Sequence, residues 1–219
     1  MRVFSSVALC LIVFLSSASS AQVTRDRAKT WEFGALVFGS SSESLNGESG
    51  SGLDIDSETG WGFTGAYNFT NRFAVMGELS WVRPRYQAEF VPENGGLETI
   101  NARLDISNFQ VKGVFNLLDG PITPFIEGGL GWTRVDSNII SSPPITGCWW
   151  DPWWGYICDT FFNTYSDTRT SFSYAGGLRW EFTSEWSVRA SYGVVELDTS
   201  SNTQDFSMDN WRVDFAWRF

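Results

Sequence analysis

The residues in this sequence that could do chemistry are ionisable side chains at alternate positions of aromatic segments. Ten of them follow this pattern: Glu32, Glu78, Lys112, Glu127, Arg179, Glu181, Arg189, Arg212, Asp214 and Arg218. Five are acidic and five are basic, and charges withdrawn from water need such partners. Two arrangements fit this set: ion pairs that fill a narrow interior, or a row of charges along which an ion passes.

Acid–base catalysis is not favoured, because the sequence contains no histidine, the side chain that most often serves as a base near neutral pH. A serine nucleophile would need Lys29 or Lys112 beside it, and we expect Lys112 to lie deep in the interior. The acidic segment 54–58 offers oxygens to a divalent cation, but its spacing does not fit an EF-hand. We expect no catalytic residue, no cofactor and no metal site.

The elements that position these charges are expected to be β-strands, because aromatic and ionisable residues alternate with period two. In the last segment one side consists of Trp211, Val213, Phe215, Trp217 and Phe219. Seven more segments follow the same rule: residues 31–38, 60–69, 73–83, 105–117, 124–132, 171–182 and 186–194. One apolar side and one charged side are typical of a transmembrane β-barrel, with lipid outside and a polar lumen inside.

The connections between these strands alternate in length. Short turns at 70–72, 118–122 and 183–185 follow the second, fourth and sixth strands, and long, polar loops follow the first, third, fifth and seventh. Bacterial outer-membrane barrels have short periplasmic turns, long extracellular loops and an even number of strands. The sequence therefore predicts an all-β fold, an eight-stranded antiparallel up-and-down transmembrane β-barrel. A soluble barrel would have to hold Trp and Phe from every strand inside, which is too much volume for eight strands.

The N-terminal residues 1–21 predict a cleaved signal peptide, with Arg2 before an apolar stretch at 7–15 and small residues at the end. This stretch is shorter than the roughly 20 residues of a transmembrane helix. We expect the barrel to occupy 22–219, with a short periplasmic lead at 22–29, in the bacterial outer membrane. The net charge of −10 argues against nucleic acid as a partner.

Two cysteines, Cys148 and Cys158, enclose an aromatic stretch of the third long loop. In an oxidising compartment they are expected to form a disulfide rather than a metal site, which would hold the loop in one shape. Two interpretations of the enclosed rings stay open: packing on neighbouring loops or at the lipopolysaccharide boundary, or an adhesive, carbohydrate-stacking surface. The rings are those of Trp149, Trp150, Trp153, Trp154 and Tyr156.

The chain resembles the small outer-membrane β-barrel family that includes the OmpA transmembrane domain, OmpX and the opacity proteins. The resemblance rests on residues 123–132, 174–179 and 211–219. It implies that Phe219 is the terminal aromatic signal for the barrel-assembly machinery. It also implies no enzyme, since the enzymatic barrels rely on histidine. The larger OmpA-type proteins add a periplasmic peptidoglycan-binding domain, and we expect that activity to be absent here because the sequence stops at the barrel. Barrels of this kind are described both as plugged and as conducting, so the resemblance does not choose between these.

The expected function is structural and surface-exposed: envelope integrity, with adhesion through the loops. The alternative is a small passive ion channel gated by lumen ion pairs. The expected lumen cluster consists of Glu78, Lys112, Glu127, Arg179, Arg189, Arg212 and Asp214, and all of these except Arg189 are expected near mid-height. Expected partners are outer-membrane lipid and lipopolysaccharide, the assembly machinery, and a host or cell-surface ligand of the loops. The protein is expected to be a monomer.

Overall fold

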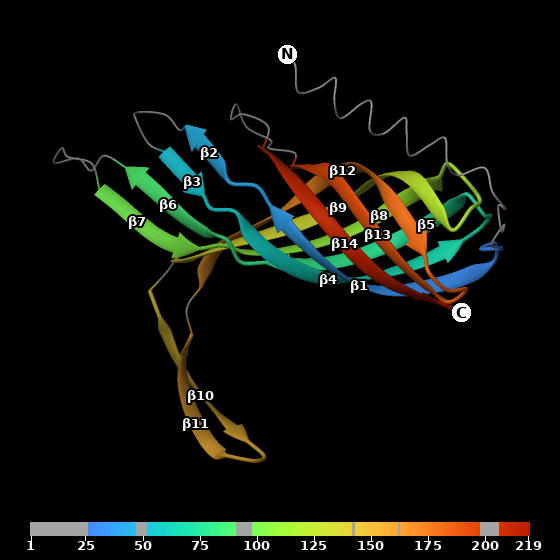
Figure 1. Cartoon of the computed structure of the whole chain (residues 1–219). Helices are drawn as coiled ribbons and strands as arrows, with labels where there is room; N and C mark the ends of the chain where they lie inside the picture. The colour runs from blue at the N-terminus through green and yellow to red at the C-terminus, as the bar shows by residue number, and fades with distance from the viewer. Residues whose placement is uncertain (1–25, 47–51, 91–97, 142, 162, 198–205) are drawn as a thin grey trace.

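The computed structural model describes residues 26–46, 52–90, 98–141, 143–161, 163–197 and 206–219. Eight strands close into an antiparallel barrel in the order β1-β14-β13-β12-β9-β8-β5-β4 (Figure 1). Their bounds are β1 (Thr30–Ser40), β4 (Glu58–Asn68), β5 (Phe73–Val82), β8 (Asp105–Asn116), β9 (Ile122–Ile140), β12 (Thr164–Glu181), β13 (Trp186–Leu197) and β14 (Phe206–Arg218). The predicted fold is confirmed. No helix among the described residues is long and apolar enough to cross a membrane.

The predicted facing of the barrel strands is also confirmed. In β14, Trp217 is 42% exposed whereas Arg218 is 7% exposed and Asp214 is fully buried. The same alternation runs through β1, where Phe33 is 52% exposed and Glu32 is buried. Aromatic and aliphatic side chains thus form the outer surface, and charged side chains fill the interior, as a lipid-facing wall requires.

Glycine on the inner wall allows the strands to carry long charged side chains in a narrow barrel. A Cβ atom at Gly131 of β9 would lie 1.9 Å from the main-chain carbonyl oxygen of Phe109 on β8. No side chain fits there without moving the neighbouring strand. The glycine-rich β9 therefore lets the wall curve closely around Lys112 and Gln110.

The structure corrects the expectation that the long connections are plain polar loops. Strands β9 and β12 continue well beyond the predicted 124–132 and 171–182. The connections also contain β2 (Glu43–Asn46), β3 (Gly52–Ile55), β6 (Arg85–Phe90), β7 (Glu98–Arg103), β10 (Ile145–Asp151) and β11 (Gly155–Phe161). Strands β2, β3, β6 and β7 form one sheet, and β10 and β11 form a hairpin. These segments stand above the lipid, so they lack the apolar alternation that reveals a membrane strand.

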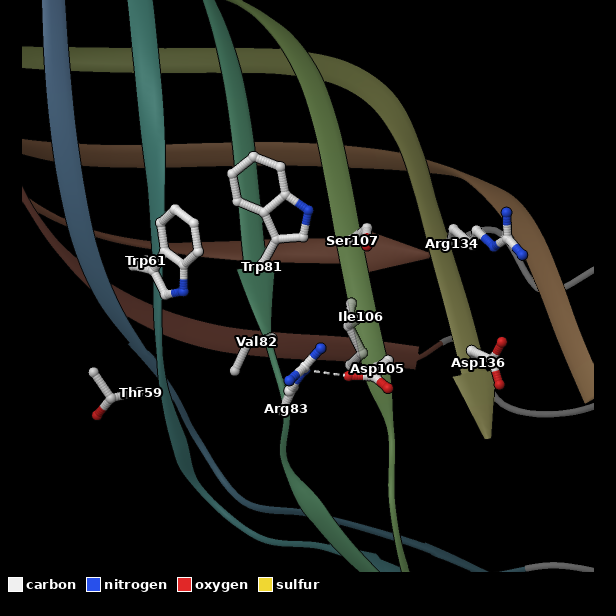
Figure 2. A pocket seen from close by; sticks show the side chains of 10 residues that line it. All are labelled: Thr59, Trp61, Trp81, Val82, Arg83, Asp105, Ile106, Ser107, Arg134 and Asp136. Atoms are coloured by element: carbon white, nitrogen blue, oxygen red, sulfur yellow. Dashed lines mark ion pairs between the residues drawn. The ribbon is translucent and has the colours of Figure 1, made fainter. Parts of the chain in front are cut away.

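The barrel wall changes direction where β5 leads into β6. Arg83 and Pro84 separate the two strands, and Leu104 separates β7 from β8. The Leu104 main-chain N–H donates to the Pro84 carbonyl oxygen over 2.9 Å. At this bend Arg83 Nε lies 2.5 Å from Asp105 Oδ1, and the two side chains point toward each other on the wall (Figure 2).

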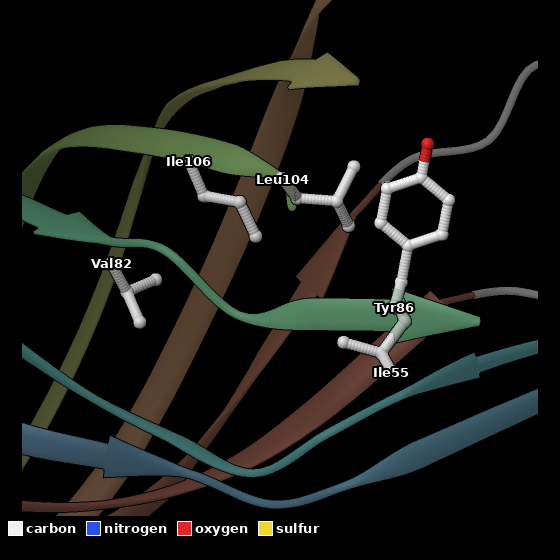
Figure 3. Packing of buried hydrophobic residues seen from close by; sticks show 5 residues of the cluster. All are labelled: Ile55, Val82, Tyr86, Leu104 and Ile106. Carbon is white, nitrogen blue, oxygen red and sulfur yellow. The ribbon is translucent and has the colours of Figure 1, made fainter. Parts of the chain in front are cut away.

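A small apolar core above the bend joins the extracellular sheet to the barrel. Its buried members converge from β3, β5, β6, the link between β7 and β8, and the start of β8 (Figure 3): Ile55, Val82, Tyr86, Leu104 and Ile106. The Tyr86 hydroxyl donates to the Ser137 carbonyl oxygen over 3.3 Å. The extracellular strands are therefore packed onto the barrel mouth by their own core.

Candidate functional site

Four buried charges form a closed ring in the upper lumen. Lys112 Nζ lies 2.8 Å from Glu78 Oε2 and 3.5 Å from Glu127 Oε1. From the far wall, Arg212 places Nη1 2.5 Å from Glu78 Oε2 and Nη2 2.7 Å from Glu127 Oε2. Each carboxylate is thus held by both cations. Because β14 lies opposite β5, β8 and β9 in the barrel order, this ring, the upper ring, bridges the lumen from wall to wall.

One ion pair lies on the neighbouring level. Arg189 of β13 places Nη2 2.8 Å from Asp214 Oδ2 on β14. The Thr64 hydroxyl on β4 donates to the same carboxylate oxygen over 3.0 Å. Both charged side chains are 2% exposed or less, so this pair is also withdrawn from water.

A second group, the lower cluster, gathers around one carboxylate at the periplasmic end. Glu181 Oε1 lies 2.5 Å from Arg27 Nε, 2.9 Å from Arg179 Nη2 and 3.2 Å from Arg218 Nη1. Arg179 Nη2 also lies 2.5 Å from Glu32 Oε1. Three guanidinium groups therefore share two carboxylates where the short turns meet.

Arg27 is a lumen residue that the sequence analysis missed, because it precedes the first strand and has no alternating neighbours. Its side chain is fully buried. Besides Glu181, its guanidinium donates to the carbonyl oxygens of Asn71, Leu118 and Gly120, at 3.1, 3.3 and 2.6 Å. These carbonyls belong to two short turns, so Arg27 ties the chain before β1 across the periplasmic mouth. Residues 22–25 of the expected lead, and the expected signal peptide, lie outside the described residues.

The expected single lumen cluster is wrong in its grouping. Glu78, Lys112, Glu127 and Arg212 do meet, but Arg179 belongs to the lower cluster rather than to mid-height. Counting residues along a strand gives the height of a backbone position, whereas a long arginine side chain reaches a carboxylate on another level. With Arg27 included, six buried cations face five buried carboxylates among the described residues.

This arrangement can block flow but offers little space for transport. A cavity of about 50 Å³ lies beside the upper ring, between Phe38, Val82 and Ile106. A cavity of that size holds only a few water molecules. Ion passage would require Arg212 or Lys112 to leave both carboxylates at once.

The β10–β11 hairpin carries the other candidate site. Cys148 and Cys158 face each other in its register and form the predicted disulfide, which is confirmed. Trp150 and Tyr156 are paired on adjacent strands at 68% and 72% exposure. At the tip, Trp153 and Trp154 are 81% and 76% exposed. The hairpin stands away from the barrel wall (Figure 1), and the side chain of Trp149 lies outside the described part.

These exposures bear on the two interpretations of the aromatic loop. Rings that packed on neighbouring loops would be largely covered, whereas Trp150, Trp153, Trp154 and Tyr156 keep more than two thirds of their surface exposed. The hairpin thus presents an open aromatic surface. Large exposed apolar patches of this kind mark interaction sites.

Phe219 is the last member of the lipid-facing aromatic row. It is 56% exposed, and its ring centroid lies 5.6 Å from that of Phe33 and 4.8 Å from that of Trp217. Its expected role as an assembly signal stays a prediction. In the acidic segment, Asp54 and Ile55 lie in β3 and Glu58 in β4. No group of three or more His, Cys, Asp or Glu that could hold a metal occurs among the described residues.

Comparisons with known proteins agree with this geometry. Residues 7–219 match the outer membrane protein beta-barrel domain family. OprG from Pseudomonas aeruginosa is 13% identical, with a TM-score of 0.51 and coverage of 90% of this chain and 99% of OprG. Ail of Yersinia pestis, solved with the heparin analogue sucrose octasulfate, is 16% identical, with a TM-score of 0.48 and coverage of 87% and 99%. Neisserial surface protein A is 8% identical, with a TM-score of 0.48 and coverage of 86% and 95%.

At 13% identity OprG shows the fold alone, and the other two structures, with TM-scores below 0.5, support no further conclusion. No functionally curated protein is similar enough in sequence to count as a match. The family match covers nearly the whole chain, and the closed barrel has the lipid-facing wall that this family uses. The chain therefore belongs to the outer membrane protein beta-barrel domain family and is a small β-barrel of the bacterial outer membrane.

Proposed function

We propose that this barrel is a non-conducting surface protein that contacts a partner outside the cell through its β10–β11 hairpin. The single observation that carries the proposal is the disulfide-closed hairpin with aromatic rings 68–81% exposed. Tryptophan and tyrosine supply a large contact area at a small cost in side-chain entropy. A disulfide across the hairpin lowers the entropy lost on binding, because the rings are held together before the partner arrives.

The charge of the extracellular side indicates the chemistry of that partner. The long connections and adjoining strand ends, residues 40–60, 83–107, 133–171 and 195–210, contain 17 Asp and Glu against 5 Arg. Such a surface repels polyanions. Between Arg134 and Arg169 there is no basic residue at all. A neutral carbohydrate, whose apolar ring faces stack on aromatic side chains, fits the hairpin better than a sulfated or nucleic-acid polymer.

The closed lumen supports the same proposal. A barrel with its interior filled by ion pairs contributes a stable wall to the envelope and presents loops, but moves no solute. We propose envelope integrity as the accompanying structural role, and we further propose export with removal of residues 1–21 and barrel assembly through Phe219.

The test measures attachment of cells that display the protein to immobilised neutral glycans. The variant Trp153→Ser/Trp154→Ser removes both tip rings, and Tyr165→Ser removes another exposed ring, on β12. Burying one such ring contributes about 1.5–3 kcal/mol, and 1.4 kcal/mol is a factor of ten. We expect the tip variant to lose at least tenfold in attachment and the Tyr165 variant to keep it. Equal attachment of the tip variant and the wild type at equal surface levels would overturn the proposal.

A further inference from the structure

The outer wall of the barrel has a hollow of about 730 Å³ at its extracellular end. Its lining includes Trp61, Trp81, Arg83, Asp105, Ser107 and Arg134, from β4, β5, β8 and β9 and the bend after β5 (Figure 2). We call it the girdle groove. It faces away from the lumen and is separate from the hairpin.

The register of the strands explains why the wall is hollow at this point. Trp61 pairs with Trp81, Trp81 with Ser107, and Ser107 with Arg134, so the four residues form one cross-strand row. Three of them have long side chains and Ser107 has a short one. The wall is therefore recessed between the indole of Trp81 and the guanidinium of Arg134.

The rows on either side place the girdle groove at the membrane boundary. The next lipid-facing cross-strand row toward the periplasm is wholly apolar and consists of Phe63, Leu79, Phe109 and Trp132. Above it come the two tryptophans of the groove, and then Arg83, Asp105 and Asp136. Tryptophan marks the interface of a barrel with lipid. The guanidinium groups at and just above this row thus lie at the level of lipid headgroups.

The two carboxylates of the groove already have partners. Asp105 forms an ion pair with Arg83, at 2.5 Å, and accepts a hydrogen bond from Asn138 Nδ2, at 2.9 Å. Asp136 accepts from the Asn138 main-chain N–H, at 3.0 Å, and from the Thr164 hydroxyl, at 2.8 Å.

Arg134 forms no close ion pair among the described residues, although its charge attracts the nearby Asp136 carboxylate. The exposed ion pairs of the described residues are Arg72–Asp119, Arg83–Asp105 and Arg169–Asp167, and Arg134 is in none of them. Its planar fork of N–H donors matches a phosphate oxygen pair. The Arg83 side chain is 78% exposed, and an exposed pair of this kind is weak. A phosphate can therefore be met by Arg134, which is in no close ion pair, and by Arg83, whose exposed pair is readily released.

We propose that the girdle groove binds the phosphorylated headgroup of an outer-leaflet glycolipid, with phosphate on Arg134 and acyl chains along Trp61 and Trp81. The Ser107 hydroxyl, at the floor of the groove, faces the same ligand as a further donor. A membrane lipid fits better than free phosphate, because the acidic extracellular connections repel an anion from solution whereas a lipid enters sideways within the leaflet. This inference does not depend on the hairpin proposal.

The test counts bound lipids on the refolded full-length barrel by native mass spectrometry. The probes are diphosphorylated lipid A, the same lipid without its phosphates, and inorganic phosphate as competitor. The variants are Arg134→Ala, and Ser107→Phe, which fills the groove without changing its charge. Arg169→Ala is the matched control, because it also removes an arginine at the extracellular end of the barrel. Arg169 pairs in register with Thr133, which is buried inside the barrel, so Arg169 lies on the opposite face of the wall from the groove. Heat-modifiable mobility in gel electrophoresis verifies folding of each variant.

We expect the wild type and Arg169→Ala to retain one diphosphorylated lipid A, and both groove variants to bind it at least tenfold more weakly. If one groove variant does not fold, the other still decides. Equal retention of the dephosphorylated lipid, or unchanged binding by a folded groove variant, would overturn the proposal. Displacement of the lipid by millimolar inorganic phosphate would overturn the assignment to a lipid headgroup.

Discussion

Replacing Arg212 by Met tests the upper ring most sharply. Arg212 contacts both carboxylates of the ring, at 2.5 Å from Glu78 and 2.7 Å from Glu127, and is 5% exposed. Methionine keeps much of the volume and removes the charge. Lys112 alone would then face two carboxylates, and the ring would carry a net charge of −1 away from water.

The size of the effect follows from this burial. Removing one partner of a buried ion pair costs roughly 3–5 kcal/mol, because it leaves an uncompensated charge. Water entering the lumen would lower the cost. A second change, Glu78→Gln, restores charge balance by leaving Lys112 with Glu127. The double variant Arg212→Met/Glu78→Gln should therefore be more stable than Arg212→Met alone, which is a coupling that independent sites do not show.

The measurement is urea-induced unfolding of the barrel in lipid vesicles, followed by tryptophan fluorescence. The control is Arg72→Met, because Arg72 forms an ion pair of 2.8 Å with Asp119 at a periplasmic turn, where the Arg72 side chain is exposed and that of Asp119 is half-buried. We expect a much smaller loss in this control. Equal losses in Arg212→Met and Arg72→Met, or additive losses in the double variant, would refute the argument that burial makes the ring essential.

Three further predictions concern other parts of the molecule. Reducing the disulfide between Cys148 and Cys158 should leave the barrel folded, by heat-modifiable mobility, and make only the hairpin sensitive to protease. Replacing Gly131 by Ala should block folding of the barrel, because the added Cβ would overlap a main-chain carbonyl of β8; loss of the heat-modifiable band measures this. The hydrogen bond from Arg72 holds the pKa of Asp119 below its ordinary value. The pair should therefore stabilise the turn above about pH 4 and lose that effect as the pH falls through the lowered pKa; the carboxyl chemical shift reports it.

Each of these has an outcome that would contradict it. Unfolding of the barrel on reduction would show that the disulfide supports more than the hairpin. A folded Gly131→Ala barrel would mean that β8 and β9 are less closely packed than described. An unchanged Asp119 titration in Arg72→Met would remove the assigned cause of the shift.

The membrane-embedded part of the fold could be predicted because lipid imposes a strict pattern. Every barrel strand must show apolar side chains to lipid at alternate positions, so Trp217 and Phe33 could be placed outward and Glu32 inward. The pairing of neighbouring strands around the barrel then follows from their order in the chain. Residues such as Ile55 and Tyr86 could not be placed in this way, because the extracellular sheet has water on one face and an irregular small core on the other.

The candidate sites were only partly predictable for a related reason. The disulfide was readable from two cysteines in an exported chain, whereas the exposure of Trp153 depends on where the hairpin projects. Which charge meets which depends on side-chain reach across the lumen, so Arg179 was placed with the wrong partners. The burial of Arg27 in the lumen could not be predicted, because Arg27 belongs to no strand and no alternating pattern surrounds it. The girdle groove arises from the register that brings Ser107 between Trp81 and Arg134.

Single-channel recording in planar lipid bilayers tests the central claim, that ion pairs close this lumen, most directly. We expect the refolded wild type to give no discrete openings, because the upper ring and the lower cluster both span the interior. We expect Arg212→Met to admit measurable current if the barrel stays folded. Stable openings of the wild type, with an ion selectivity that changes when Lys112 or Arg212 is neutralised, would contradict the closed lumen and establish a channel instead.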